Sequence, residues 1–166
     1  MIRKKLYFIL LILFSSCSLK PKHEPIEVIV KFNESYKYDL SKGEYTIFYL
    51  NQPPTIINFH LSAQEMKEIQ NKYYSLNIDK IKKNDKRNEK IFMVDNCRIM
   101  PKDNTILNIQ SKNIKQEIQI DLYCNSYPLS NWIEARHVKR FIAFVVKIIR
   151  SKPEIKNAPL SDILYM

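Results

Sequence analysis

Residues 55–76, TIINFHLSAQEMKEIQNKYYSL, decide the fold class because they join a strand pattern directly to a helix pattern. Apolar residues stand at every second position over residues 57–61, which is typical of a strand that buries one face. Ser62 and Glu65 then have the spacing of a capping box, in which each side chain binds a free backbone N–H at the start of a helix. The segment therefore predicts a strand followed by a helix that ends near Leu76.

Strand patterns lie on both sides of this segment, and a second helix pattern comes later. A short break at 51–54 predicts an antiparallel hairpin between this strand and the one before it. The other strands are expected at residues 26–32, 45–50, 91–94, 106–110 and 114–123. The second helix is expected from Asn131 to shortly before Pro153, with an apolar face formed by Val138, Phe141, Ile142, Val145, Ile148 and Ile149. Together these elements predict an α+β fold, an antiparallel sheet of about five or six strands with two helices packed on one face.

The N-terminal residues have a different character. Three cations at positions 3–5 precede an apolar run at 6–14, and Ser15-Ser16-Cys17 follows. The run is too short to cross a bilayer, because a spanning helix needs roughly 20 apolar residues. The segment resembles the signal peptide of bacterial lipoproteins, which ends in a lipobox.

The resemblance implies that residues 1–16 are removed and that Cys17 becomes a lipidated N-terminus. An ordinary cleaved secretory signal and an uncleaved anchor are the alternatives. Residues 17–25 are then expected to form the lipidated cysteine and a tether, and residues 26–166 a single α+β domain. Ser18 and the lack of clustered acids favour the outer membrane of a bacterial cell envelope, facing the periplasm, over the inner membrane or the cell surface.

The charge of the chain indicates which classes of partner to expect. The formal charge is +10, and it falls to +7 when Arg3, Lys4 and Lys5 leave with the signal. Such a surface attracts anionic lipid head groups or an acidic protein. We expect no nucleic-acid partner, because an exported lipoprotein is separated from nucleic acid.

Glycine usage excludes several classes of enzyme. The chain has one glycine, Gly43. A phosphate-binding loop, a dinucleotide-binding fingerprint and a nucleophile elbow each need several glycines for tight turns and close backbone approach. Most nucleotide-dependent enzymes and the α/β-hydrolases are therefore excluded, and no cofactor is expected.

Two cysteines remain after Cys17. In an oxidising compartment, Cys97 and Cys124 are expected to form a disulfide, which would contribute roughly 3–4 kcal/mol in the chain-entropy model. Two free thiols or a metal-binding pair are the alternatives. A metal site would need further ligands nearby, and neither cysteine has a close Cys or His neighbour in the sequence.

The charged and polar residues show no catalytic pattern. Glu134 and His137 have the Glu-x-x-His spacing of di-iron helical bundles, but the second copy and the additional carboxylates of such sites are missing. A surface pair is the expected role. His60 and His23 stand apart from any carboxylate pattern, so we expect no metal site.

Aromatic residues give the best candidates for a partner contact. Tyrosine and tryptophan are favoured at interfaces because they bury a large area and keep a polar tip. Tyr36 and Tyr38, expected in a loop, and Trp132, at the start of the second helix, are the candidates. The sequence thus favours a lipid-anchored, non-catalytic binding module of the envelope, acting in immunity, inhibition or an envelope complex. The alternative is a hydrolase of envelope polymers whose site is assembled from distant residues.

Overall fold

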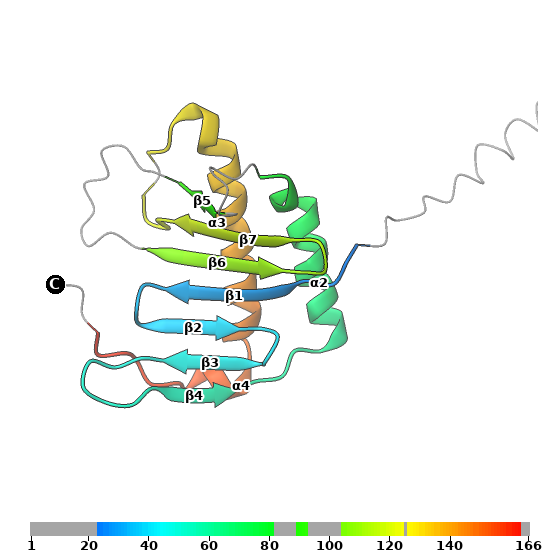
Figure 1. The fold of residues 1–166 in the computed structure, drawn as a ribbon. Helices are drawn as coiled ribbons and strands as arrows, with labels where there is room; N and C mark the ends of the chain where they lie inside the picture. Colours follow the sequence, from blue (N-terminus) through cyan, green and yellow to red (C-terminus); the bar gives the residue numbers. More distant parts are fainter. Residues whose placement is uncertain (1–22, 82–88, 93–103, 125, 164–166) are drawn as a thin grey trace, which may run out of the picture.

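The computed structural model describes residues 23–81, 89–92, 104–124 and 126–163. These residues form a seven-stranded sheet in the order β4-β3-β2-β1-β6-β7-β5, with α2 and α3 covering one face (Figure 1). The strands are β1 (Glu27–Phe32), β2 (Tyr36–Asp39), β3 (Glu44–Ile47), β4 (Thr55–Asn58), β5 (Glu89–Ile91), β6 (Thr105–Gln110) and β7 (Lys115–Ile120). The helices are α2 (Ala63–Ser75), α3 (Leu129–Arg150) and α4 (Pro153–Lys156), and η1 (Ile78–Lys80) is a 3-10 turn.

The predicted α+β class is confirmed, and three finer predictions are wrong. The sheet has seven strands instead of five or six. β2 was not predicted, because it has only four residues and lies between polar turns. The sheet is also not wholly antiparallel, since β5 runs parallel to β7. There is also a third helix, α4. Pro153 was expected only to end the second helix, but it stands in the first turn of α4, where proline is well tolerated.

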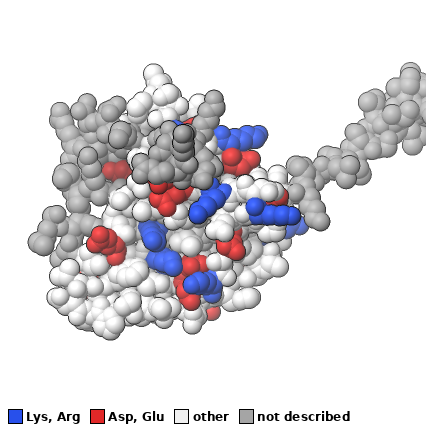
Figure 2. Space-filling model, viewed as in Figure 1, with Lys and Arg blue, Asp and Glu red and all other residues white. Residues whose placement is uncertain are grey.

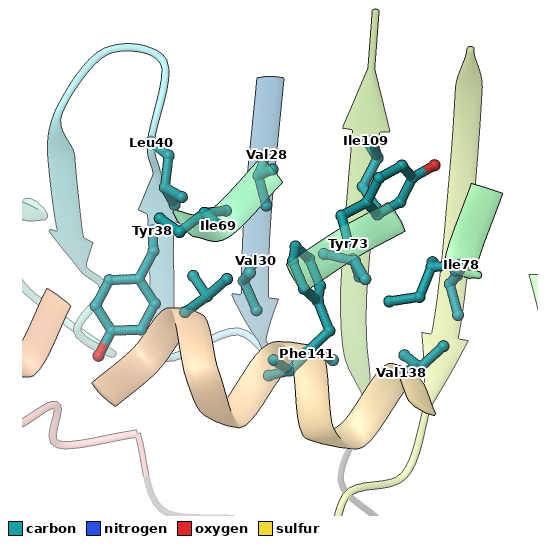
Figure 3. Close-up of a cluster of buried hydrophobic side chains, with 14 of the residues drawn as sticks. Val28, Val30, Tyr38, Leu40, Ile69, Tyr73, Ile78, Ile109, Val138 and Phe141 are labelled. Atoms are coloured by element: carbon teal, nitrogen blue, oxygen red, sulfur yellow. The ribbon is translucent and has the colours of Figure 1, made fainter. Parts of the chain in front are cut away.

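The core lies between the sheet and the two long helices. Alternate residues of β1, β6 and β7 point to the helices, as the period of two requires. Figure 3 shows Val28, Val30 and Ile109 of the sheet converging on Tyr73 of α2 and Phe141 of α3. The rings of Tyr73 and Phe141 lie 5.8 Å apart in an edge-to-face arrangement, so the two helices meet above the central strands.

The predicted capping box of α2 is present and has a partner outside the helix. The Ser62 hydroxyl accepts a hydrogen bond from the Glu65 backbone N–H at 3.2 Å, and the Ser62 backbone N–H donates to the Glu65 carboxylate at 2.8 Å. Lys152, between α3 and α4, donates to both carboxylate oxygens of Glu65 at 2.6 and 2.7 Å. One carboxylate therefore starts α2 and ties it to the end of α3.

The single glycine is required by the turn between β2 and β3. Gly43 has a φ of +66°, a left-handed conformation that other residues adopt at a cost. A Cβ atom at this position would lie 2.4 Å from the carbonyl oxygen of Phe59. The Phe59 N–H in turn donates to the Gly43 carbonyl at 2.8 Å, so the glycine allows β4 to end close against this turn.

Residues just before β1 contact α2 and the β6–β7 turn. His23 stacks on Tyr74 of α2, with ring centroids 4.0 Å apart and an interplanar angle of 8°. Gln70 donates to the His23 carbonyl at 2.9 Å, and the Glu24 carboxylate accepts from Ser111 and Asn113 in the β6–β7 turn. His23 and Glu24, which the sequence assigns to the tether, therefore contact the domain.

The Glu65–Lys152 pair makes stability depend on pH. The Lys152 ammonium, followed by the Ser62 backbone N–H, lowers the pKa of Glu65 from 4.5 to about 2. A lowered pKa in the folded state contributes stability above the unfolded-state pKa, and this contribution is lost as the pH falls toward the folded value. We expect Glu65→Gln to reduce the free energy of unfolding by about 1 kcal/mol near neutral pH. The loss should shrink as the pH falls below 4.5 toward about 2.

Urea unfolding across this pH range measures the effect. Glu68→Gln is the matched control, because Glu68 lies on the exposed side of α2 and accepts a hydrogen bond from Gln64 of the same helix. An equal loss for Glu65→Gln at every pH would contradict the role of the ion pair.

Candidate binding surface

The N-terminal end of α3 exposes three large apolar side chains. Leu129 is 94% exposed, Ile133 59% and Trp132 42%. In Figure 1 the first turns of α3, in yellow, lie beyond the β5 edge of the sheet, so the sheet does not cover them. Ala135 and Val138, on the side of α3 that faces the core, are fully buried and fix the orientation of these turns. The predicted candidate Trp132 is therefore held at the surface by a well-packed helix.

A recess of about 260 Å³ lies beside Trp132 and is lined by Tyr127, Trp132, Arg136 and Lys139. The Arg136 guanidinium lies 5.2 Å from the centroid of the Trp132 ring. The Lys139 ammonium lies 4.9 Å from the centroid of the Tyr127 ring. Such cation–π contacts hold aromatic rings and cations side by side, so the recess combines apolar walls with positive charge.

The polar ends of two lining residues are already engaged. The Tyr127 hydroxyl donates to the carbonyl of Asp121, and the Lys139 ammonium donates to the carbonyls of Leu122, at 2.9 Å, and Cys124. These bonds hold the Tyr127 and Lys139 side chains against residues 121–124, which follow β7. They also leave the recess with aromatic surface and positive charge, and with no group placed to act as a base or nucleophile among the four lining residues.

Beneath this end of α3 lies a buried lysine. Lys90 of β5 points to the helices and pairs with Glu134 at 3.3 Å; its ammonium also contacts Asn131 at 3.4 Å. The ammonium lies 5.2 Å from the centroid of Phe92. A buried charge needs such partners, because an unpaired one is strongly destabilising. Glu134 therefore anchors α3 to the edge strand.

Two of the histidine candidates lie on different parts of the fold. His137 lies half-buried on α3, one turn after Glu134, whose carboxylate is engaged by Lys90. His60 follows β4 and is exposed. In the part of the chain that the structure describes, no three His, Cys, Asp or Glu side chains are grouped to hold a metal ion.

Two of the three aromatic candidates are placed differently from the prediction. Tyr36 and Tyr38 lie in β2, not in a loop, and Tyr38 is only 2% exposed. Tyr38 stacks on Tyr45 at 4.6 Å, and a hydrogen bond to Tyr38 raises the pKa of Arg150. Tyr36 is half-buried, and its hydroxyl accepts from the Ser161 backbone N–H at 3.0 Å. Tyr38 is thus a core residue, and Tyr36 holds the C-terminal segment.

The open face of the sheet is a second surface, but its charges are mixed. Figure 2 shows Lys and Arg interspersed with Asp and Glu on this face. A hollow of about 420 Å³ crosses β1, β6, β7 and β5, and its charged lining residues are Glu27, Glu89, Lys115 and Glu117. Because their signs are mixed, we assign the hollow no ligand.

The cysteine predictions fall mostly outside the described residues. Cys17 and Cys97 lie outside them, while Cys124 is buried just after β7. The Cys97–Cys124 disulfide therefore stays a prediction. Over the described ranges, no helix has the length and apolar character needed to cross a bilayer.

Comparisons with protein-family models, with curated proteins and with solved structures find no match to this chain. The surface must therefore be interpreted from its own chemistry.

Trp132 was predicted as a contact residue from the sequence, whereas the residues around it were not. Arg136 and Lys139 follow Trp132 by four and seven positions, which places all three on one side of a helix. This spacing was a usable signal. The contribution of Tyr127 depends on how the connection from β7 folds back, which no local pattern shows.

The Lys90–Glu134 pair gives a testable consequence for the position of α3. We expect Glu134→Ala to cost about 1–2 kcal/mol, since it leaves the Lys90 ammonium without its carboxylate. Lys90→Met should change stability by less than about 1 kcal/mol, because an apolar side chain of similar length removes the need for a partner.

A double-mutant cycle measured by urea unfolding provides the control. In the Lys90→Met background, Glu134→Ala should cost little, because the charge it compensated is gone. The same cost in both backgrounds would mean that the two residues do not act as a pair.

Proposed function

We propose that this protein is a lipid-anchored, non-catalytic binding module of the bacterial cell envelope, tethered through Cys17 to the periplasmic side of the outer membrane. Immunity, inhibition of an envelope enzyme, or membership of an envelope complex are the roles that fit such a module. The support for the anchor is the charged start, the short apolar run and the small residues before Cys17.

The recess beside Trp132 is the observation that supports a binding role. Its walls are two aromatic rings and two cations, and the hydroxyl and ammonium groups in it are bonded to backbone carbonyls. Trp, Tyr and Arg are the side chains that dominate binding energy at protein interfaces. A site of this composition holds a partner and offers no group to cleave it.

The docked N-terminal segment supports a close anchor. His23 is held on α2, so only residues 18–22 separate the domain from Cys17. Extended at the rise of a polyproline helix, these residues span about 15 Å. A lipid on Cys17 would therefore keep the domain next to the membrane surface, and its partner would be reached there.

The anchor is tested by Cys17→Ser. We expect wild-type protein to partition into detergent and to incorporate a labelled fatty acid, and the variant to do neither, because two or three acyl chains hold a protein stably at a membrane. Cys124→Ser is the control and should retain both properties. Wild-type protein that stays in the aqueous phase without label would contradict lipidation.

Binding is tested by capture from envelope extract. We expect the lipidated protein to retain a stoichiometric protein partner, and Trp132→Ala to lose it. Tyr123→Ala is the matched control, since Tyr123 is an exposed aromatic residue that does not line the recess. In parallel, purified envelope polymers are incubated with the protein and searched for soluble fragments by mass spectrometry. Released fragments would favour the hydrolase and contradict the proposal.

A further inference from the structure

The outward side of α3 carries charge of one sign. Ile133, Arg136, Arg140, Ala143 and Lys147 are exposed and follow one another at alternating spacings of three and four, so they lie along one side of the helix. We call this set the basic stripe. Its three cations extend over about 16 Å at the rise of an α-helix.

Within the described part of the chain, the basic stripe keeps its positive charge. Glu134, the one acidic residue of α3, is engaged by Lys90 at 3.3 Å. Over the residues that the structure describes, no carboxylate lies within ion-pair distance of Arg136, Arg140 or Lys147. This distinguishes the stripe from the open face of the sheet, where both signs alternate (Figure 2).

The stripe leads directly into the recess. Arg136 belongs to both, because it lines the recess and lies over the Trp132 ring at 5.2 Å. The volume of about 260 Å³ is suited to one or two side chains. Leu129 and Ile133 add exposed apolar area on the first turns of the same helix. The surface therefore has an apolar anchor point at one end and a row of cations that continues from it.

We propose that the outward side of α3 binds an acidic segment of a partner protein, with an apolar side chain of that segment in the recess and its carboxylates along the basic stripe. This inference rests on the proposed function and specifies the partner of that binding module. Charge complementarity would attract and orient the segment, and the recess would fix its register.

The recess at one end of the basic stripe favours a protein as the partner over a lipid surface. A membrane interface is contacted by side chains that project from a protein, whereas a recess enclosed by Trp132 and Tyr127 accepts a side chain from outside. The apolar side of α3 is buried against the sheet, so the helix is unable to insert that side into a bilayer. The stripe offers point contacts for carboxylates, with Arg136 and Arg140 one turn apart and Lys147 two turns further on.

Peptide binding to the full, lipidated chain in uncharged detergent tests the proposal. The probe is a labelled peptide of Glu and Ala, about four helical turns long, with one Leu near its end. A peptide of equal length with Lys in place of Glu is the reference. Fluorescence anisotropy should show binding of the acidic peptide alone, with an affinity that falls as salt is raised.

Charge reversal locates the surface. The variant Arg136→Glu/Arg140→Glu/Lys147→Glu should weaken binding by about tenfold or more, and Trp132→Ala should do likewise. The control Lys31→Glu/Lys112→Glu/Lys115→Glu makes the same change of net charge at exposed positions of the sheet and of its β6–β7 turn. It should weaken binding by less than about threefold. Circular dichroism verifies that each variant folds. If the charge-reversed stripe variant does not fold, Arg140→Gln/Lys147→Gln is used in its place.

The outcomes separate this proposal from the proposed function. Equal weakening in both charge-reversed proteins, or unchanged binding in Trp132→Ala, contradicts the proposal. Binding through the stripe to anionic phosphatidylglycerol vesicles, without binding to the acidic peptide, also contradicts it and assigns the stripe to lipid. If capture of a partner from envelope extract still depends on Trp132 in those cases, the proposed function as a binding module is retained and its partner is of a different kind. Release of polymer fragments overturns the function itself.

Discussion

The packing of α3 against one face of the sheet is the interaction on which the rest of the structure depends. Its inward side chains, Ala135, Val138, Phe141, Ile142, Val145 and Ile149, are all buried. Full burial of each large aliphatic or aromatic side chain contributes roughly 1.5–3 kcal/mol. Tyr73 of α2 meets Phe141 edge-on, and Glu65 of α2 is tied to Lys152 beyond α3, so α2 is held partly through α3. Without α3, the sheet would expose the apolar residues of β1, β6 and β7.

The same helix determines what the molecule presents to a partner. Because the inward side of α3 is fixed by the core, Trp132 and Arg136 on its other sides are held in place before any partner arrives. Such preorganisation reduces the entropy that binding must overcome. The Lys90–Glu134 pair fixes the projecting end of α3 to the edge strand β5, so the exposed surface is supported from beneath. Core packing and binding surface are thus two sides of one element.

Local patterns predicted much of this fold, and the errors have a common cause. The Ser62–Glu65 capping box and the apolar side of α3 depend on residues three or four apart, and both were found. β2 was missed because Tyr38 is covered by elements distant in sequence, and its strand pairs with β1 and β3. The recess and the docking of His23 on Tyr74 likewise join residues that are distant in sequence. Trp132 was selected for its residue type, whereas its setting required the tertiary structure.

Amide hydrogen exchange of the full chain in detergent tests most directly whether α3 and the central strands form one cooperative unit. The account predicts that residues 135–149 of α3 and those of β1 and β6 exchange most slowly, with the same free energy of opening, because each layer is stable only against the other. Exposed Leu129 and the first turn of α3 should exchange faster. Exchange of the middle of α3 at a much lower free energy than β1 and β6 would contradict the account.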